Sequence, residues 1–282
     1  MLGLILFLFG LLVGSFLGVV VDRIPKGETI IKGRSYCEFC KKELSLPDLI
    51  PVFSFVLLKG RCRYCHKKLS LYYPIIEFGT GILFVLTYVF IISNFKFQIS
   101  NELLNQDFLI PNEIFNHQSI IINLIYYLFI VSSFIVIFFT DLKYGIIPDK
   151  IIFPAIVISI FYFLVFNSLS LIPHLISGLG AFLFFLAISY IFYFFTKKQS
   201  MGGGDIKLSF LLGLFLGFPK IIVSLYLAFL TGGVLSIILI LWKKKAFSKD
   251  SLPFGPFLIF AAILSFFFGN IIYSRFLVFL GM

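Results

Sequence analysis

Two aspartates lie at the edges of strongly apolar stretches, where a carboxylate is costly. Asp141 directly follows the apolar run 120–140, and Asp205 stands just before the apolar run 206–217. Ionisable groups near the membrane core are expensive and usually functional. Two carboxylates that share one proton can hydrolyse a peptide bond, because one activates water while the other, protonated, polarises the carbonyl. The pair therefore predicts acid–base catalysis at a membrane face.

Asp149 is an alternative to Asp141 as the catalytic aspartate in this part of the sequence. It precedes a new apolar run, where its carboxylate can accept hydrogen bonds from the free amides that open a helix. Asp141 stands at the end of its predicted helix, where the helix dipole disfavours a negative charge. We therefore interpret Asp149 as a helix-capping residue and assign the catalytic role to Asp141 and Asp205 together, as a pair that titrates jointly.

Three glycines, Gly202, Gly203 and Gly204, directly precede Asp205. Glycine is unfavourable inside a helix by about 1 kcal/mol relative to alanine, so stability does not explain this run. A backbone without side chains lets an extended substrate approach the carboxylate, or lets the chain turn sharply. The glycines are therefore predicted to lie next to the substrate, although a flexible linker before a capping aspartate remains the alternative.

All four cysteines belong to an internal repeat. Cys37-Glu-Phe-Cys40-Lys-Lys-Glu-Leu-Ser and Cys62-Arg-Tyr-Cys65-His-Lys-Lys-Leu-Ser align without a gap. Each pair can bind one metal ion from a tight turn, and two such turns complete a four-sulfur site. The repeat thus predicts a closed, structural zinc site formed by Cys37, Cys40, Cys62 and Cys65. Disulfides or redox chemistry are the alternative, and His66 could replace one ligand.

The composition predicts a polytopic membrane protein. Hydrophobic residues make up 60% of the 282-residue chain and charged residues 13%. Repeated apolar runs approach the length that crosses a bilayer, which predicts an all-α fold embedded in lipid. About eight spans are expected, at 1–21, 73–92, 120–140, 151–167, 171–195, 206–217, 220–242 and 254–280. The sixth is too short to cross alone and is expected to be tilted, incomplete or re-entrant.

The distribution of basic residues predicts the orientation. Twenty lysines and arginines fall in the segments 22–72, 141–150, 196–207 and 243–250, whereas only Lys96, Lys220 and Arg275 lie elsewhere. Positive residues accumulate on the cytoplasmic side, so these four segments are predicted to be inside, with Asp141 and Asp205 at the cytoplasmic boundary. The net charge of +10 then reflects membrane topology, and no nucleic-acid partner is expected.

The chain is expected to divide into three parts. Residues 1–21 form a retained first helix, 22–72 a cytoplasmic loop domain that carries the cysteines, and 73–282 a helical membrane domain with both aspartates. The apolar run 49–58 inside the loop domain either packs beneath the metal turns or lies among lipid headgroups. The polar segment 93–119 lacks motifs and is predicted to be a loop.

Several motifs together resemble the bacterial type IV prepilin peptidases, membrane aspartic proteases with a Gly-x-Gly-Asp motif. The resemblance covers nearly the whole chain, in family order. It is carried by Gly14-Ser-Phe-Leu-Gly-Val-Val, Arg34-Ser-Tyr-Cys37-Glu-Phe-Cys40, Cys62-Arg-Tyr-Cys65, Tyr73-Pro-Ile-Ile-Glu77, the stretch Asp141 to Asp149, Gly202-Gly-Gly-Asp205-Ile-Lys207 and Pro253-Phe-Gly-Pro256-Phe. At Gly18 the family commonly has asparagine.

This resemblance implies an activity, its substrates and a methyl donor. Such enzymes cut the basic leader from prepilins and type II secretion pseudopilins at the cytoplasmic face of the bacterial inner membrane. Asp141 and Asp205 match the family's catalytic pair. Many members also methylate the new amino terminus with S-adenosylmethionine, and this methylation is associated with the cysteine loop. The residues that bind S-adenosylmethionine are unassigned. Glu77 is a candidate, and the alternative is that Glu77 is only a carboxylate favoured by the dipole at a helix start. A peptidase without methylation and a proton- or cation-coupled transporter remain the other functional hypotheses.

Overall fold

The computed structural model describes residues 1–30, 33–104, 113–197, 201–242 and 253–279. The described part is mostly helical, and most of its irregular chain, with two isolated β-bridges, lies between α1 and α3 beside the cysteines. Its elements are α1 (Leu2–Arg23), a 3-10 turn η1 (Leu46–Leu49), α2 (Phe53–Leu57), α3 (Tyr72–Leu104), α4 (Glu113–Tyr144), α5 (Asp149–Phe166), α6 (Ser168–Thr196), α7 (Gly203–Leu216), α8 (Lys220–Leu241) and α9 (Gly255–Phe279).

Seven of the described helices are long and apolar enough to cross a membrane. They correspond to seven of the eight expected spans, and the all-α membrane fold is confirmed. The chain is a multi-pass membrane protein. The remaining segment, the sixth expected span, forms α7, whose 14 residues cover only about 21 Å of a core about 30 Å thick. Nearly all of α7 after Lys207 is buried among other helices, as a short intramembrane helix requires.

The expectation of a loop over the whole segment 93–119 is wrong. The helix α3 continues to Leu104 and α4 begins at Glu113, so most of the segment is helical. Extending an existing helix costs little once its nucleus has formed, and the adjoining apolar spans supply that nucleus. Residues 105–112 lie outside the described part, as do the basic residues of 243–250.

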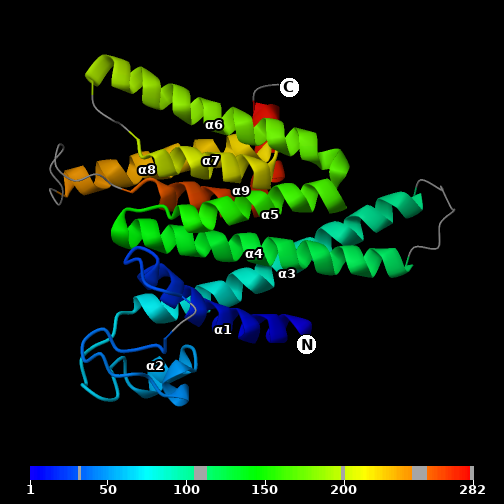
Figure 1. Ribbon diagram of the computed structural model, residues 1–282. Coiled ribbons are helices and arrows are strands. Elements are labelled where there is room, and N and C mark those ends of the chain that lie inside the picture. The colour runs from blue at the N-terminus through cyan, green and yellow to red at the C-terminus, as the bar shows by residue number, and fades with distance from the viewer. Residues whose placement is uncertain (31–32, 105–112, 198–200, 243–252, 280–282) are drawn as a thin grey trace. The chain divides into compact units, whose positions relative to one another are not determined.

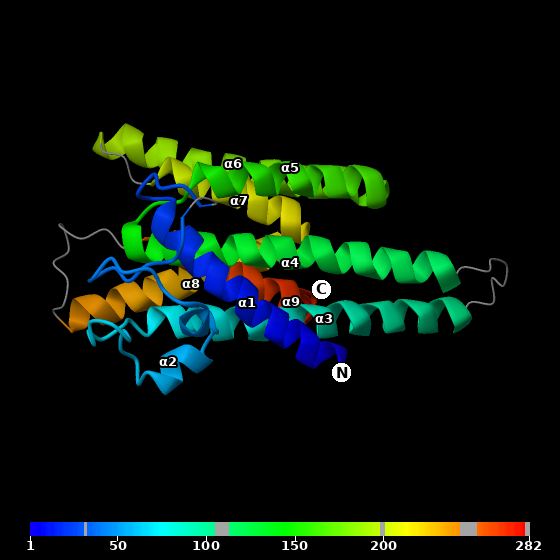
Figure 2. The ribbon, with the colours of Figure 1, turned by 60° about the horizontal axis from the view of Figure 1, so that its bottom comes forward.

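The chain forms two compact units, residues 1–136 and 137–282, with the boundary inside α4. In the first unit α1 runs along α3 (Figures 1 and 2). Glycines let the two backbones approach closely: a Cβ atom on Gly14 would lie 2.7 Å from the Cα of Glu77. Small residues at helix contacts are a common packing device in membranes. The division into 1–21, 22–72 and 73–282 remains a functional prediction.

In the second unit α7 packs mainly against α6 and also contacts α5, α8 and α9. Aromatic side chains fill part of the core, where Phe185 of α6 stacks on Phe229 of α8 with ring centroids 5.9 Å apart. Phe254, just before α9, contacts both rings. These contacts fix the start of α9 against α6 and α8, which matters for Asp141.

Candidate active site and metal centre

Asp141 lies in the last turn of α4 and is only 5% exposed. The backbone N–H of Gly255, the first residue of α9, donates a hydrogen bond to Asp141 Oδ2 at 3.0 Å. A free amide at a helix start stabilises a carboxylate. Here the Gly255 amide offsets the unfavourable effect of the α4 dipole on the charge of Asp141. The motif Pro253-Phe-Gly-Pro256 thus opens α9, and its glycine also contacts Asp141.

Asp205 lies in the first turn of α7, which begins at Gly203 with Gly202 as its N-cap. Its backbone N–H donates to the Gly202 carbonyl at 3.1 Å. The side-chain atom Oδ1 is buried and has no hydrogen-bond partner among the described residues. Burial first, and the charge of Asp141 second, raise the pKa of Asp205 to about 7. A buried, unpaired carboxylate oxygen in a native fold needs an explanation, and a shared proton or a bound substrate supplies one.

The structure brings the two aspartates together through a tightly packed junction. Ile147, between α4 and α5, contacts both Gly204 and Gly255. A Cβ atom on Gly204 would lie 2.8 Å from the Cβ of Ile147, and one on Gly255 only 2.5 Å from Asp141 Oδ2. A side chain at either position would therefore force a neighbouring group to shift. Sixty-four positions separate the carboxylates in sequence, yet they interact electrostatically in the fold.

The triple glycine has two different environments. Gly204 is packed against Ile147, whereas Gly202 and Gly203 are exposed, and a Cβ atom on Gly203 would meet no neighbour. A Cβ atom on Gly202 would lie 3.5 Å from Asp205 Oδ2. The chain beside Asp205 is thus open on the side of Gly202 and Gly203, which fits the predicted approach of a substrate. Contact with a substrate remains a prediction.

Asp149 is the first residue of α5, in the turn where the dipole favours a negative charge. Its carboxylate accepts two hydrogen bonds from Lys207 Nζ, at 2.8 and 3.0 Å. This ion pair joins the start of α5 to the first turn of α7, two residues beyond Asp205. Asp149 thus has a structural partner of its own. The sequence did not predict the pairing of Lys207 with Asp149, because nothing local relates two residues 58 positions apart.

The two cysteine motifs fold into matching turns. In each, the carbonyl of the first cysteine accepts a hydrogen bond from the residue four positions on, at 2.8 Å for Lys41 and 3.0 Å for His66. Both of those residues have a positive φ, and a β-bridge flanks each turn. The repeat seen in the sequence is therefore a repeat in structure.

The four sulfur atoms all lie within 4.8 Å of one another. Cys37 Sγ is 3.9 Å from Cys65 Sγ, close to the separation of about 3.8 Å that follows from Zn–S bonds of about 2.3 Å in a tetrahedron. All four cysteines are free, and 3.9 Å is far beyond a disulfide bond of about 2.05 Å. Burial alone would raise the pKa of the Cys62 thiol, but hydrogen bonds from the Cys65 and Tyr64 amides lower it to about 7. A backbone hydrogen bond from Lys67 lowers the pKa of Cys65, but burial and hydrogen bonds with the other three thiols together raise it to about 11. The donor set fits one metal ion.

The two turns are also joined by a reciprocal pair of cation–π contacts. Lys42 of the first turn lies 4.3 Å from the ring centroid of Tyr64 in the second, and Lys67 of the second lies 5.0 Å from that of Phe39 in the first. The repeated aromatic and lysine positions thus serve contacts between the copies. These lysines also bring positive charge to a four-thiolate site, which is negative when it holds a divalent ion.

The apolar run 49–58 is partly exposed and partly turned toward a cavity, and a position among lipid headgroups remains a prediction. Phe53, Val56 and Leu57 are exposed, whereas Phe55 and Leu58 line a cavity beneath the metal turns. Glu77, in the second turn of α3, accepts a hydrogen bond from the Val52 N–H at 2.7 Å. This long-range bond was not predicted, since no sequence pattern indicates which amide a helix-start carboxylate will meet.

The chain is similar in sequence to known proteins over nearly its whole length. One family model, described as the bacterial peptidase A24 N-terminal domain, matches residues 8–91, and another, the type IV leader peptidase family, matches 128–237. The prepilin leader peptidase/N-methyltransferase of Bacillus subtilis is 31% identical, over 96% of this chain and 96% of that protein. Proteins of the same name from Pseudomonas aeruginosa and Aeromonas salmonicida are 27% and 26% identical, over 97% and 94% of this chain and 93% and 90% of their own lengths. No solved structure matches the chain.

Proposed function

As this chain belongs to the type IV leader peptidase family, we propose that it removes the leader from prepilins and pseudopilins and N-methylates the new amino terminus. The cleavage occurs at the cytoplasmic face of the bacterial inner membrane, where the excess of basic residues in four segments indicates the inner side. S-adenosylmethionine is the methyl donor, and a structural zinc ion is held by Cys37, Cys40, Cys62 and Cys65.

The observation that supports cleavage most is that Asp141 and the start of α7 meet at one packed junction, where Ile147 lies against both Gly204 and Gly255. The charge of Asp141 also contributes to raising the pKa of Asp205. With one proton between them, the ionised carboxylate takes a proton from water as the water oxygen attacks the scissile carbonyl carbon. The protonated carboxyl donates a hydrogen bond to the carbonyl oxygen. The Gly255 amide holds Asp141 in position for either role. Zinc, bound by four thiolates, has no open position, so it stabilises the loop domain and takes no part in the hydrolysis.

The test is cleavage of a synthetic prepilin by the purified chain in detergent, measured as kcat/KM between pH 4 and pH 9. Because the pKa of Asp205 is raised to about 7, the pair keeps its proton at neutral pH and loses it as the pH rises further. Both carboxylates are then charged and the acid is missing; at low pH both are protonated and the base is missing. We therefore expect a bell-shaped profile whose alkaline limb begins near pH 7.

A rate that keeps rising above pH 8 would contradict the shared proton, and no cleavage at any pH would contradict the peptidase itself. Adding S-adenosylmethionine labelled in its methyl group to the same reaction tests the second activity. Label should appear on the amino terminus of the cleaved pilin. Cleavage without label would show that the chain is a peptidase without methyltransferase activity.

Replacing Gly255 with alanine is expected to lower cleavage by about a hundredfold, the effect of displacing a catalytic group by about 1 Å. The added methyl group would lie 2.5 Å from Asp141 Oδ2, so the carboxylate or the start of α9 must shift. Gly180→Ala in α6 is the matched control, because a Cβ atom there meets no neighbour, and it should cleave normally. Equal rates for the two variants would show that the contact with Gly255 does not position Asp141.

A further inference from the structure

The short helix α2 presents an apolar face that no described part of the chain covers. Phe53, Val56 and Leu57 are 57–65% exposed, and Ile50, just before the helix, is exposed as well. The other side of α2 contributes Phe55 to the cavity beneath the metal turns, so only this face is left without a partner. Exposed apolar residues that cluster in this way mark a surface that binds a membrane or another protein.

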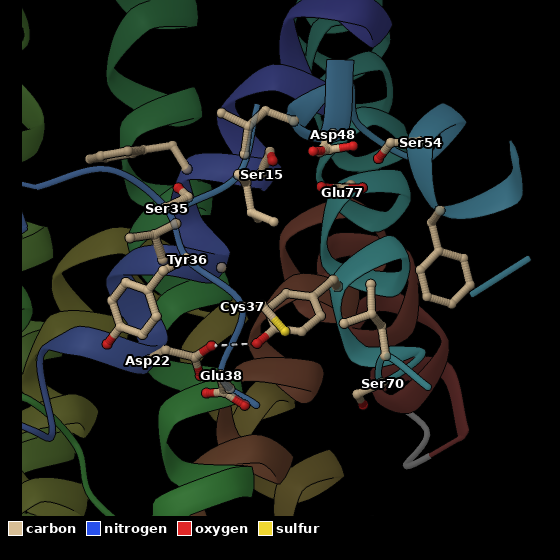
Figure 3. A pocket seen from close by; sticks show the side chains of 18 of the residues that line it. Ser15, Asp22, Ser35, Tyr36, Cys37, Glu38, Asp48, Ser54, Ser70 and Glu77 are labelled. Carbon is tan, nitrogen blue, oxygen red and sulfur yellow. Dashed lines mark hydrogen bonds between the residues drawn. The ribbon is translucent and has the colours of Figure 1, made fainter. Parts of the chain in front are cut away.

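A hydrogen bond brings this face to the depth of the second turn of a membrane span. The span in α3 begins at Tyr72, and Glu77 lies five residues further along it. Glu77 accepts the bond from the Val52 amide, directly before α2, and Ser54 of α2 lines the same cavity as Glu77 (Figure 3). Five residues advance an α-helix by roughly 7.5 Å, which is about the thickness of one headgroup layer.

A second cavity, of about 460 Å³, follows directly on the exposed face. It is lined by Leu58, Lys59, Arg61, Cys62, Arg63 and His66, and we call it the basic cavity. Three of these six side chains are positively charged at neutral pH, and none is a carboxylate. Arg63 pairs with Asp48 at 2.6 Å, whereas Lys59 and Arg61 have no ion pair among the described residues. The basic cavity therefore offers two uncompensated cations, and a guanidinium is well suited to bind a phosphate group.

Backbone hydrogen bonds hold the basic cavity between α2 and the second metal turn. The Lys59 amide donates to the Val56 carbonyl at 3.0 Å, and the Gly60 amide donates to the Phe55 carbonyl at 2.8 Å. On the other side the Leu69 amide donates to the Gly60 carbonyl at 2.8 Å. Lys59 and Gly60 both have a positive φ, which turns the chain sharply at the end of α2. The two cations are thus fixed beside the exposed apolar residues.

We propose that α2 and the basic cavity form a binding site for an anionic phospholipid of the bilayer. The exposed apolar side chains of α2 lie among the acyl chains, and Lys59 and Arg61 bind the lipid phosphate. The charge of the cavity complements anionic lipids, which attract basic residues at the cytoplasmic surface. The apolar surface also continues onto α3, where Ile75 and Phe78 are at least half exposed. The site rests on the proposed cytoplasmic location of 22–72 and on neither proposed activity.

The first test measures whether α2 contacts lipid. The chain has one tryptophan, so Trp242→Phe gives a background without any, and Val56→Trp adds a reporter at an exposed position. The full chain is reconstituted in nanodiscs of equal parts phosphatidylcholine and phosphatidylglycerol, with bromine in the upper acyl chains as the quencher. The reporter should be quenched as strongly as one made by Phe78→Trp, on the exposed apolar side of α3, in the same background.

The second test measures which lipid is bound. Bromine is carried either by phosphatidylglycerol alone or by phosphatidylcholine alone, and the two quenching curves of the Val56→Trp reporter give the relative association constant. We expect a preference of about thirtyfold for phosphatidylglycerol, the attraction of two basic residues near an anionic lipid. Lys59→Asn combined with Arg61→Gln should reduce this preference to about one. Asparagine is chosen because it tolerates the positive φ of position 59.

Lys41→Asn combined with Arg34→Gln is the matched control. Lys41 also has a positive φ, and both residues are exposed parts of the same loop domain that do not line the basic cavity. The control therefore removes the same charge with the same two substitutions and should keep the thirtyfold preference. Thermal unfolding in detergent, measured for every variant, reports whether the chain is folded.

The proposal is overturned if the Val56→Trp reporter in a folded chain is not quenched, because α2 would then face water or a protein partner. It is also overturned if the preference for phosphatidylglycerol survives Lys59→Asn with Arg61→Gln. Equal loss of the preference in the control would likewise contradict a defined site, since the attraction would then be a general effect of the basic loop domain. None of these measurements depends on prepilin cleavage or methylation.

Discussion

Asp141→Asn and Asp205→Asn are each expected to lower prepilin cleavage by about a thousandfold or more, within the range that acid–base groups contribute. Asparagine keeps the size of the side chain but can neither take a proton from water nor hold the shared one. At position 141 it can still accept the hydrogen bond from the Gly255 amide, so the fold of the second unit should survive. The measurement is kcat/KM on a synthetic prepilin, with thermal unfolding in detergent as the check on folding.

Asp149→Asn is the matched control for both changes. Asp149 pairs with Lys207, and no role in the chemistry is assigned to it. An ion pair as exposed as this one contributes about 1 kcal/mol or less, so the variant should remain folded and keep most of its activity. If Asp149→Asn were folded but inactive, or if either variant of the pair cleaved at the wild-type rate, the catalytic assignment would be wrong.

Cys62→Ser is expected to remove the bound metal and unfold the segment between Tyr36 and Leu69. A structural zinc ion contributes an apparent 10–16 kcal/mol or so in small domains, which a segment with few buried residues cannot replace. Metal analysis and the reaction of the three remaining thiols with a maleimide measure the two effects. Cleavage should persist, because Asp141 and Asp205 belong to the other unit.

His66→Asn tests the ligand assignment in the same assay. His66 has a φ of 56°, a conformation that asparagine tolerates better than most residues, so the turn should fold. The variant should retain one metal ion per chain, since four sulfurs already complete the site. Loss of metal from His66→Asn, or full metal retention in Cys62→Ser, would contradict a site made of four cysteines.

Local patterns predicted much of the molecule. The lengths of the apolar runs predicted the membrane spans and the short helix α7. The repeated spacing of the cysteines predicted one cluster of four sulfurs, from Cys37, Cys40, Cys62 and Cys65. Both predictions succeed because membrane thickness and metal coordination impose fixed lengths on short stretches of chain.

The connections between distant elements were not predicted. The Gly255 amide that meets Asp141, the Lys207 side chain that pairs with Asp149, and the Val52 amide bound by Glu77 all join residues 25 or more positions apart. Such pairs depend on how helices pack, and helix periodicity indicates only which residues face a neighbour, not which neighbour. The cavity beside the cysteine turns was missed for the same reason, because its wall is assembled from four separate elements.

Because the amide that holds Asp141 belongs to Gly255, the active site is completed late in the synthesis of the chain. Asp141 and Asp205 leave the ribosome before the residue whose amide holds Asp141, which follows Asp205 by 50 positions. At about 5–20 residues per second this interval lasts roughly 3–10 s. Until α9 has been inserted, the nascent chain carries both aspartates without their finished geometry. A chain truncated before α9 should therefore stay inactive.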